Sequence, residues 1–434
     1  MGRPANIFLA VAAASGMQLV ASYDPIAGYT PVSDVESHSL LDLDMEEMES
    51  NADLKTIAGF TAATSAYSEG GNSVKSDDSI RTIQGFSVNA QEKLSGEPWF
   101  EVYENYWGVG ADYADQFTLS ACEGTGAFSE ASFETRAEAC VKGAQYQNVW
   151  MYVIHELEDA ISDCEKGDLN ANDGGPHAWD EGWAFYAGSL EGTDGSGDGF
   201  MIHALAEKRC ANFGTCTGDE DGSPITGSAQ INADLLVLFA EGQTKLIDGE
   251  CDSARDIKEE IVNLITVPLV QGLLRYFYLA DPMIGLGEEK EEAELWSFAA
   301  SVLPRIALCD EDIAVTIRAN AEIGSGDAPM SEGYEVLKQK LESVYSCMGI
   351  SCGQVGGLLI DGAADTYYTG FEPCEDPDDG GIGGLGVGLI VAAAAVAVLA
   401  IAGCVVCKRR KKRSREAMES DLGGFGANKP TSTL

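Results

Sequence analysis

One histidine and several acidic residues stand on two neighbouring segments whose pattern predicts helices. The first segment, 152–164, reads YVIHELEDAISDC, and the second, 179–192, reads WDEGWAFYAGSLEG. Residues three or four apart share a face of a helix, so His155 stands beside Glu158 and Asp159. Imidazole nitrogen and carboxylate oxygen without a thiolate suit ferric iron or manganese better than a softer metal. An acidic helix face is also common as a plain solvated surface.

The second segment carries Asp180 and Glu181 in its first turn, where acidic side chains complement the helix dipole. Small residues follow at 182, 184, 187 and 188, so another helix can approach this face closely. Carboxylates at such a contact are partly buried, which is unfavourable unless they bind a cation. We therefore include Asp180 and Glu181 among the expected metal ligands.

The sequence HELED also admits a zinc peptidase. The H-E-x-x-H motif places two histidines one turn apart on the same zinc ion, and here the second position is Asp159. An irregular H-E-x-x-D site with Asp180 or Glu181 as a third ligand remains an alternative. His177 precedes the second segment, in what we expect to be a loop, and is a further candidate ligand.

Two stretches from the first half of the chain recur in weaker form later in the sequence. The tetrapeptide N-A-D-L occurs twice at an offset of 181 residues. WDEGWAFYAGSL also aligns with EAELWSFAASVL, which places Trp183 opposite Trp296 and Glu181 opposite Glu294. These matches predict an internal duplication.

The second copy offers different chemistry at the matching helix. Aligning the two copies puts Arg275 opposite His155, and Tyr276 and Tyr278 opposite two of the acids. Phenolate oxygen is a hard ligand for ferric iron, and an arginine can hold carbonate or another anion through two parallel hydrogen bonds. In the simpler alternative, Arg275 pairs with an acid such as Asp281 and the tyrosines only pack.

The elements that must position these residues are predominantly helical. Few runs alternate with period 2, whereas helical periodicity recurs in most long segments. We predict an all-α fold, a duplicated antiparallel helical bundle outside the cell, followed by one C-terminal transmembrane helix. Ten cysteines precede that helix, an even number in an oxidising compartment, so up to five disulfides are expected.

Both ends of the chain carry targeting signals. Residues 1–22 combine Arg3, an apolar run and small residues, as a secretory signal peptide does. Residues 385–406 are long and apolar enough to span a bilayer, and KRRKKR follows directly, which places the C-terminus in the cytoplasm. The predicted domains are the signal peptide (1–22), a first helical repeat (23–217) with an aromatic and acidic insert (about 87–135), a second helical repeat (218–371), an acidic glycine-rich stalk (372–384), the transmembrane helix (385–406) and a basic cytoplasmic tail (407–434).

The charge is concentrated in the extracellular part. The whole chain has 27 basic and 70 acidic residues and a net charge of −43. Arg3 lies in the signal and the tail carries eight basic and three acidic residues, so the segment between has 18 basic and 67 acidic residues. Such a body repels nucleic acid and attracts cations.

The body resembles the algal low-iron-inducible periplasmic proteins, the family that includes the phytotransferrins of marine phytoplankton. The resemblance rests on HELEDAISDC (155–164), WDEGWAFYAGSLEG (179–192), LAEKRCANFGTC (205–216) and QGLLRYFYLAD (271–281). It spans about residues 40–365, and the signal, stalk, span and tail are similar to membrane-anchored members. It implies capture of ferric iron at the cell surface with carbonate as a synergistic anion, followed by internalisation. The H-x-x-E spacing at His155 is also similar to imelysin-like helical iron-associated proteins.

From the residues and this resemblance we expect a non-enzymatic iron receptor in the plasma membrane. Fe³⁺ and carbonate are its expected ligands, and endocytic or PDZ-type proteins are expected partners of the tail, which ends in TSTL. A membrane-anchored metallopeptidase and a metal-free adhesion ectodomain are the alternatives. The expected metal ligands are His155, Glu158, Asp159, Asp180, Glu181, Tyr276 and Tyr278, with Arg275 binding carbonate.

Overall fold

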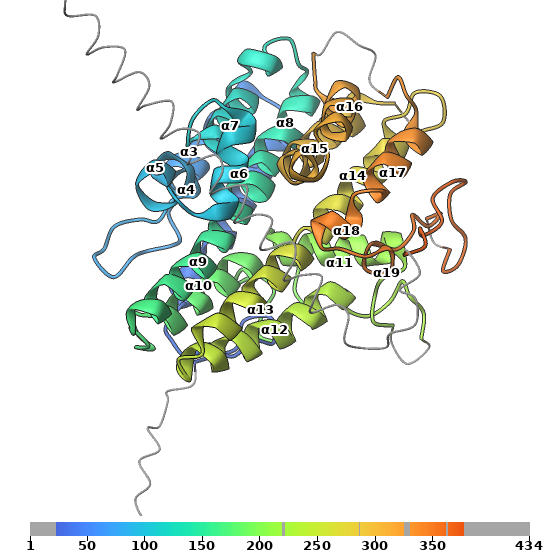
Figure 1. Ribbon diagram of the computed structural model, residues 1–434. Helices are drawn as coiled ribbons and strands as arrows, with labels where there is room; N and C mark the ends of the chain where they lie inside the picture. The colour runs from blue at the N-terminus through green and yellow to red at the C-terminus, as the bar shows by residue number, and fades with distance from the viewer. Residues whose placement is uncertain (1–22, 219–221, 286, 325–329, 362, 377–434) are drawn as a thin grey trace, which may run out of the picture.

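The computed structural model describes residues 23–376, except 219–221, 286, 325–329 and 362 (Figure 1). Within these residues the secondary structure is helical, and the only β-pairing consists of four isolated bridges. The predicted all-α class is therefore confirmed for the described residues. The predicted signal peptide, the transmembrane helix, the tail and most of the stalk lie outside them.

The helices of the first half surround the two segments that carry the histidine and the acids. In chain order they are α1 (Glu36–Ser39), α2 (Leu41–Ala52), α3 (Ile57–Glu69), α4 (Ile83–Val88), α5 (Ala90–Lys93), α6 (Pro98–Trp107), α7 (Tyr113–Glu123), the short 3₁₀ helix η1 (Gly126–Phe128), α8 (Phe133–Gly143), the π-helical turn η2 (Ala144–Val149), α9 (Trp150–Lys166), α10 (Gly175–Ala187) and α11 (Ile202–Phe213).

The helices of the second half follow a disulfide-closed loop. They are α12 (Gln230–Ile247), α13 (Cys251–Leu264), α14 (Val267–Leu279), α15 (Glu289–Cys309), α16 (Glu311–Ala321), α17 (Tyr334–Glu342), α18 (Tyr345–Met348) and α19 (Cys352–Val355). In Figure 1, α9, α10, α12 and α13 form the lower layer, α3 to α8 lie above them, and α14 to α17 lie to the right.

The close packing of α9 against α10 follows from the small residues noted in the sequence. A Cβ atom on Gly182 would lie 3.2 Å from Leu157 Cδ2, and one on Gly175 would lie 2.7 Å from the carbonyl oxygen of Ala160. A larger side chain at Gly175 would therefore push the helices apart. Gly167 ends α9 in the left-handed conformation (φ 81°), which glycine adopts without a steric penalty.

One continuous hydrophobic core joins the two predicted repeats, with members from Ile26 to Phe371. Trp183 and Trp296 both lie in long helices, α10 and α15, as the aligned segments predict. The two N-A-D-L segments differ locally, because the first runs past the end of α2 and the second lies inside α12. The duplication and the domain boundaries stay predictions.

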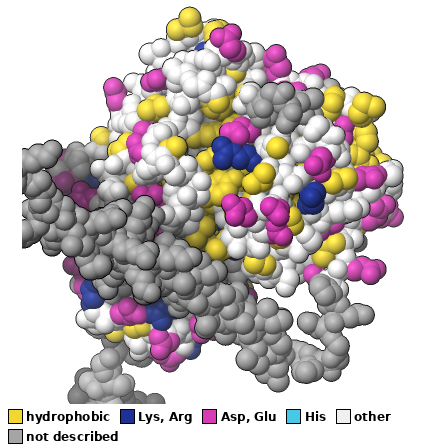
Figure 2. Space-filling view, turned by 45° about the horizontal axis from the view of Figure 1, so that its top comes forward, with side chains coloured by type: hydrophobic (Ala, Val, Ile, Leu, Met, Phe, Trp, Pro, Cys, Tyr) yellow, Lys and Arg dark blue, Asp and Glu magenta, His cyan; other side chains and the backbone are white. Residues whose placement is uncertain are grey.

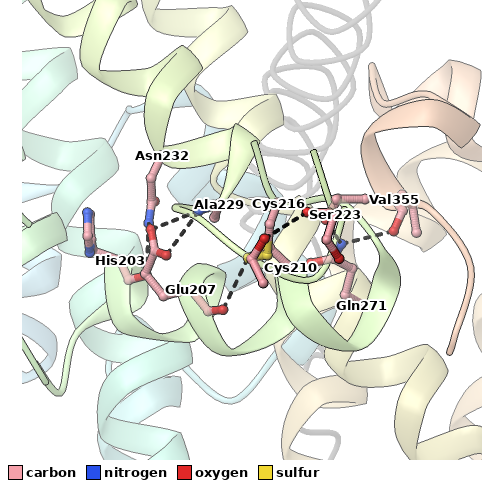
Figure 3. The surroundings of a disulfide bond; sticks show 11 residues. His203, Glu207, Cys210, Cys216, Ser223, Ala229, Asn232, Gln271 and Val355 are labelled. Carbon is pink, nitrogen blue, oxygen red and sulfur yellow. Dashed lines mark hydrogen bonds between the residues drawn. A yellow bond between two sulfur atoms is a disulfide. The ribbon is translucent and has the colours of Figure 1, made fainter. Parts of the chain in front are cut away.

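Five disulfides use all ten cysteines of the predicted ectodomain, which confirms the expected number. They are Cys122–Cys140, Cys164–Cys251, Cys210–Cys216, Cys309–Cys347 and Cys352–Cys374. Figure 3 shows the smallest loop, at the end of α11. There Glu207 accepts hydrogen bonds from the backbone N–H of Ala229 and from Asn232 Nδ2, so this disulfide and Glu207 together fix the start of α12.

One described stretch, Cys251–Leu279, is long and apolar enough by composition to cross a membrane. Most of its apolar window (83%) is buried inside the molecule, as expected of a core helix.

Candidate metal centre

Two histidines and one glutamate converge at the contact between α1 and α10. The Nε2 atoms of His38 and His177 each lie 2.9 Å from the same oxygen, Glu181 Oε1. One ligand atom from each of the three residues lies within 4.8 Å of the other two. This is the only group of three such side chains found among the described residues.

The local structure explains why these rings meet. The helix α10 begins at Gly175 with Pro176 in its first turn, where proline's missing N–H is harmless. His177 is therefore helical, which corrects the expectation of a loop, and it stands one turn before Glu181. His38 comes from α1, and its ring contacts those of His177 and Phe185 edge-on, at centroid distances of 5.8 and 5.6 Å.

The protonation of the three groups is set by burial and by their mutual contacts. Burial lowers the pKa of His38, more than its contact with Glu181 raises it. Burial also acts to lower the pKa of His177, but the hydrogen bond and charge of Glu181 outweigh it and raise this pKa above its ordinary value. For Glu181, the opposing effect of burial is outweighed by hydrogen bonds and charges from His177 and His38, so its pKa is well below the usual range. The site thus combines an ionised carboxylate with one neutral imidazole.

Glu181 also faces a cavity of about 390 Å³. We call it the histidine cavity; its polar lining includes Tyr152, His155, Glu156, Asp159, Glu181, Lys75, Arg81 and Lys93. Burial and the charge of Glu181 raise the pKa of Glu156 well above its ordinary value, and the hydrogen bond between the two carboxyl groups acts in the same direction. On the same wall, His155 Nδ1 lies 2.6 Å from Glu97 Oε1, the kind of orienting contact that metal-binding imidazoles make.

Three cations line this cavity: Lys75, Arg81 and Lys93. Arg81 donates a hydrogen bond to Ser73 Oγ (2.8 Å), and Lys93 Nζ donates to the hydroxyl of Tyr152 (2.7 Å). Among the described residues, no ion pair within 4.0 Å involves Lys75, Arg81 or Lys93, although three acids line the same cavity. These charges remain available to an anion.

The structure brings three of the expected ligands together, His155, Asp159 and Glu181, which line one cavity. Asp180 points elsewhere and is fully buried. It accepts hydrogen bonds from the hydroxyls of Tyr29 (2.5 Å) and Ser33 (2.7 Å), so it fixes the N-terminal segment.

Glu158 also lies outside this cavity's lining. It is 2.6 Å from Lys258 Nζ, a buried lysine that it shares with Glu259. Its role in the described residues is an ion pair between α9 and α13.

The expected phenolate and anion ligands on α14 are not brought to His155. Arg275 lies 3.9 Å from Asp361 Oδ1, and Tyr278 packs against Tyr368 with ring centroids 4.3 Å apart. Tyr276 stacks on Phe298 of α15. The reason is that α14 packs against α11, α15, α17 and α19, whereas the histidine cavity lies among α4, α5, α9 and α10.

Sequence reasoning missed His38 and Arg81. His38 is 139 residues before His177, so no local spacing connects them. The sequence offers one signal, the rarity of histidine, with four in the chain. That each of them contacts a glutamate is visible only in the structure.

The donor set fits an iron ion. Two imidazoles and one carboxylate with further open positions are the facial ligand set of many iron sites, and zinc uses the same set. Among the described residues, the buried Nδ1 atoms of His38 and His177 have no hydrogen-bond partner, so each ring is held by polar contact with Glu181 alone.

In a comparison with protein-family models, residues 6–276 match the family described as low iron-inducible periplasmic protein. No curated protein and no solved structure matches the chain.

Proposed function

Because the chain belongs to the low iron-inducible periplasmic protein family, we propose that it captures ferric iron at the cell surface for uptake. The family's description ties it to iron limitation and to a compartment outside the cytoplasm. The observation that carries the proposal is the convergence of His38 and His177 on one oxygen of Glu181. Iron is the cargo in this proposal, and the protein is not an enzyme.

The ferric ion would be held by those three side chains. Glu181 supplies a hard anionic oxygen whose low pKa keeps it ionised, and His38 supplies a neutral nitrogen. The cavity that Glu181 faces is also lined by Tyr152, Glu156 and His155, which are candidates for the remaining coordination positions. Compared with the sequence prediction, Glu181 is retained and the tyrosines of α14 are replaced by Tyr152.

Carbonate would bind beside the metal at Arg81, not at Arg275. Arg81 lines the histidine cavity and has no carboxylate within 4.0 Å among the described residues, whereas Arg275 faces Asp361. A guanidinium offers two parallel donors that match the oxygens of carbonate. Lys93 lines the same cavity and adds positive charge to it.

Uptake would follow by internalisation into an acidic compartment. His177 must give up its proton to bind the metal, so acid competes with iron for this ring. Carbonate is also lost on protonation. The predicted membrane anchor and cytoplasmic tail belong to this part of the proposal.

The test is a titration of the full-length protein, purified in detergent, with ferric nitrilotriacetate. We expect one tightly bound ferric ion per chain, with higher affinity in bicarbonate than in a bicarbonate-free buffer. His177→Gln removes the binding, and Glu158→Gln, whose lysine partner keeps Glu259, leaves it unchanged. Saturable binding that is equal in wild type and His177→Gln would overturn the assignment of the site. Equal ferric affinity with and without bicarbonate would show that carbonate is not a ligand.

A zinc hydrolase is the second candidate, because two histidines and a glutamate are also a catalytic zinc set. Glu156, whose pKa is raised beside Glu181, would then be the group that transfers a proton. This reading predicts tighter binding of Zn²⁺ than of Fe³⁺ and cleavage of peptides that stops with a chelator. The absence of both would leave iron capture in place, and a metal-free adhesion role predicts no binding of either ion.

A further inference from the structure

A second cavity, of about 420 Å³, lies between α2, α8, α11 and α15. We call it the lysine cavity because five basic side chains line it: Lys55, Lys142, Lys208, Arg209 and Lys290. The segment between residues 23 and 376 has only 18 basic residues, so more than a quarter of them face one cavity. Figure 2 shows the usual pattern of one face, with acidic side chains spread over it and basic ones confined to a few places.

The inner wall of this cavity is already neutralised. Lys142 forms ion pairs with Glu138 and, at 3.3 Å, with Glu294, and Lys290 lies 3.2 Å from Glu138. Burial acts to lower the pKa of Lys142, but Glu294 and Glu138 outweigh it, so this ammonium stays charged. An ammonium therefore occupies the place between the carboxylates that a metal cation would need.

The helix α11 adds two cations to this cavity, whose remaining acidic side chains are Glu49 and Asp53. Among the described residues, neither Lys208 nor Arg209 has a carboxylate within 4.0 Å. Arg209 donates one hydrogen bond, to Asn212 Oδ1 at 2.8 Å, and its buried Nε has no partner. Its guanidinium also lies 5.9 Å from the ring centre of Phe298, which limits where the group can move.

Unpaired cations are unusual in so acidic a body, and their distribution is uneven. Within the part of the chain that the structure describes, ten of the 18 basic side chains lie within 4.0 Å of a carboxylate, which leaves eight. Three of the eight line the histidine cavity and two line the lysine cavity. Solvated surface charge would not gather in this way, because exposed lysines find acidic neighbours almost everywhere on such a protein.

From this geometry we propose that the lysine cavity binds a small polyvalent anion, a polycarboxylate or a tetrahedral oxyanion, through Lys208 and Arg209. The volume is that of an ordinary small-molecule site and accommodates a tricarboxylate. Lys55 and Lys290 line the same cavity, but they are paired with Glu134 and Glu138, so the free positive charge comes from Lys208 and Arg209. A monovalent anion would form a charged hydrogen bond with only one of the two free cations. The cavity should therefore select polyvalent over monovalent anions.

The experiment is isothermal titration of the full-length protein in detergent, at constant ionic strength, with citrate, sulfate and acetate in turn. We expect saturable binding of citrate or sulfate and none of acetate. Citrate alone would identify a polycarboxylate site, and sulfate alone would identify a tetrahedral oxyanion site. No saturable binding of either polyvalent anion would overturn the proposal.

Variants then locate the binding. Lys208→Gln, an exposed position that leaves the core intact, should raise the Kd about tenfold, the effect of one lost charge-assisted hydrogen bond. Lys340→Gln is the matched control, because Lys340 also has no carboxylate within 4.0 Å among the described residues but lies on α17, away from both cavities. An equal loss in both variants would mean that only net charge is sensed and would overturn the proposal. His177→Gln should leave anion binding unchanged, so this result is independent of iron binding.

Discussion

The histidine cavity and the lysine cavity each contain a glutamate that is hydrogen-bonded to a neighbouring helix. They differ in the cation that contacts this glutamate. In the histidine cavity, Glu181 of α10 shares a hydrogen bond with Glu156 of α9. In the lysine cavity, Glu294 of α15 is hydrogen-bonded to Tyr276 of α14. The sequence alignment of the two predicted repeats sets Glu181 opposite Glu294 and Glu156 opposite Tyr276.

The difference lies in the neighbouring cations. Beside Glu181 stand two imidazoles, which can lose a proton and offer a lone pair to a metal ion. Beside Glu294 stands Lys142, whose ammonium has no lone pair to offer while it stays protonated. A carboxylate thus faces two imidazoles at the proposed metal site, whereas its counterpart forms an internal ion pair in the lysine cavity.

The largest effect is expected when the ammonium of Lys142 is removed, because this group is what distinguishes the lysine cavity from the histidine cavity. In Lys142→Met, Glu138 and Glu294 lose their shared partner in a largely buried place, where breaking an ion pair costs roughly 3–5 kcal/mol. We expect a loss of about 3 kcal/mol in the free energy of unfolding, since the lysine side chain keeps 15% exposure. Urea denaturation of the disulfide-intact protein measures it.

Lys290→Met is the matched control, because Lys290 contacts the same Glu138 but its side chain is 46% exposed. Such a pair contributes less than about 1 kcal/mol. Similar losses in the two variants would show that Lys142 is not the cation that holds the lysine cavity together.

A second prediction compares the aligned glutamates directly. Glu181→Gln keeps the shape of the side chain and removes the charge on which both imidazoles converge. We expect ferric affinity to fall more than about 100-fold, since even residues that only orient ligands cost 10–100-fold. Competition against a chelator of known affinity measures it.

Glu294→Gln supplies the contrast and should leave ferric affinity unchanged, because its carboxylate is paired with Lys142. If both substitutions reduce the number of bound ions, each cavity holds a metal and the distinction between them is wrong.

The sequence predicted the helices of the histidine cavity better than it predicted the site itself. The periodicity around His155 predicted a helix, and α9 extends it by a few residues at both ends. The small residues around Gly182 predicted close packing of α10, because that effect is local in the chain.

The ligand set could not be predicted in the same way. His38 joins Glu181 only because α1 packs on α10, and Arg81 reaches the cavity from a loop. Aligning the repeats placed Arg275 opposite His155, but an alignment gives equivalent positions in two copies, not contacts between them. Tyr276 therefore belongs with Glu294, its own neighbour, and not with His155.

A third prediction concerns the two arginines considered for carbonate. Arg81→Gln should lower ferric affinity about tenfold in bicarbonate and abolish the difference between buffers with and without it, because one charge-assisted contact is lost. Arg275→Gln should change neither, since Arg275 faces Asp361 outside the cavity. A bicarbonate effect that persists in Arg81→Gln and disappears in Arg275→Gln would return the anion to α14.

The smallest expected effect is on pH dependence. Ferric affinity at the histidine cavity and anion affinity at the lysine cavity should change in opposite directions as the pH falls. His177 contacts Glu181 at the edge of the histidine cavity, and its pKa is raised because Glu181 outweighs burial, so its proton must leave before iron binds. Falling pH therefore weakens ferric binding, by less than about tenfold per pH unit for one displaced proton.

In the lysine cavity, falling pH is expected to strengthen ligand binding instead of weakening it, and the responsible group is Glu49. Burial raises the pKa of Glu49, and the charges of Asp53 and Glu138 add to this against the opposing effect of Lys142 and Lys208. Falling pH neutralises Glu49 early and removes a negative charge from the cavity wall, so anion binding should tighten. Sulfate is the suitable probe, because it stays a dianion between pH 5.5 and 7.5, and titrations of iron and sulfate across that range compare the two signs. If both affinities fall together, acid is loosening the fold as a whole, and the two cavities do not respond through His177 and Glu49.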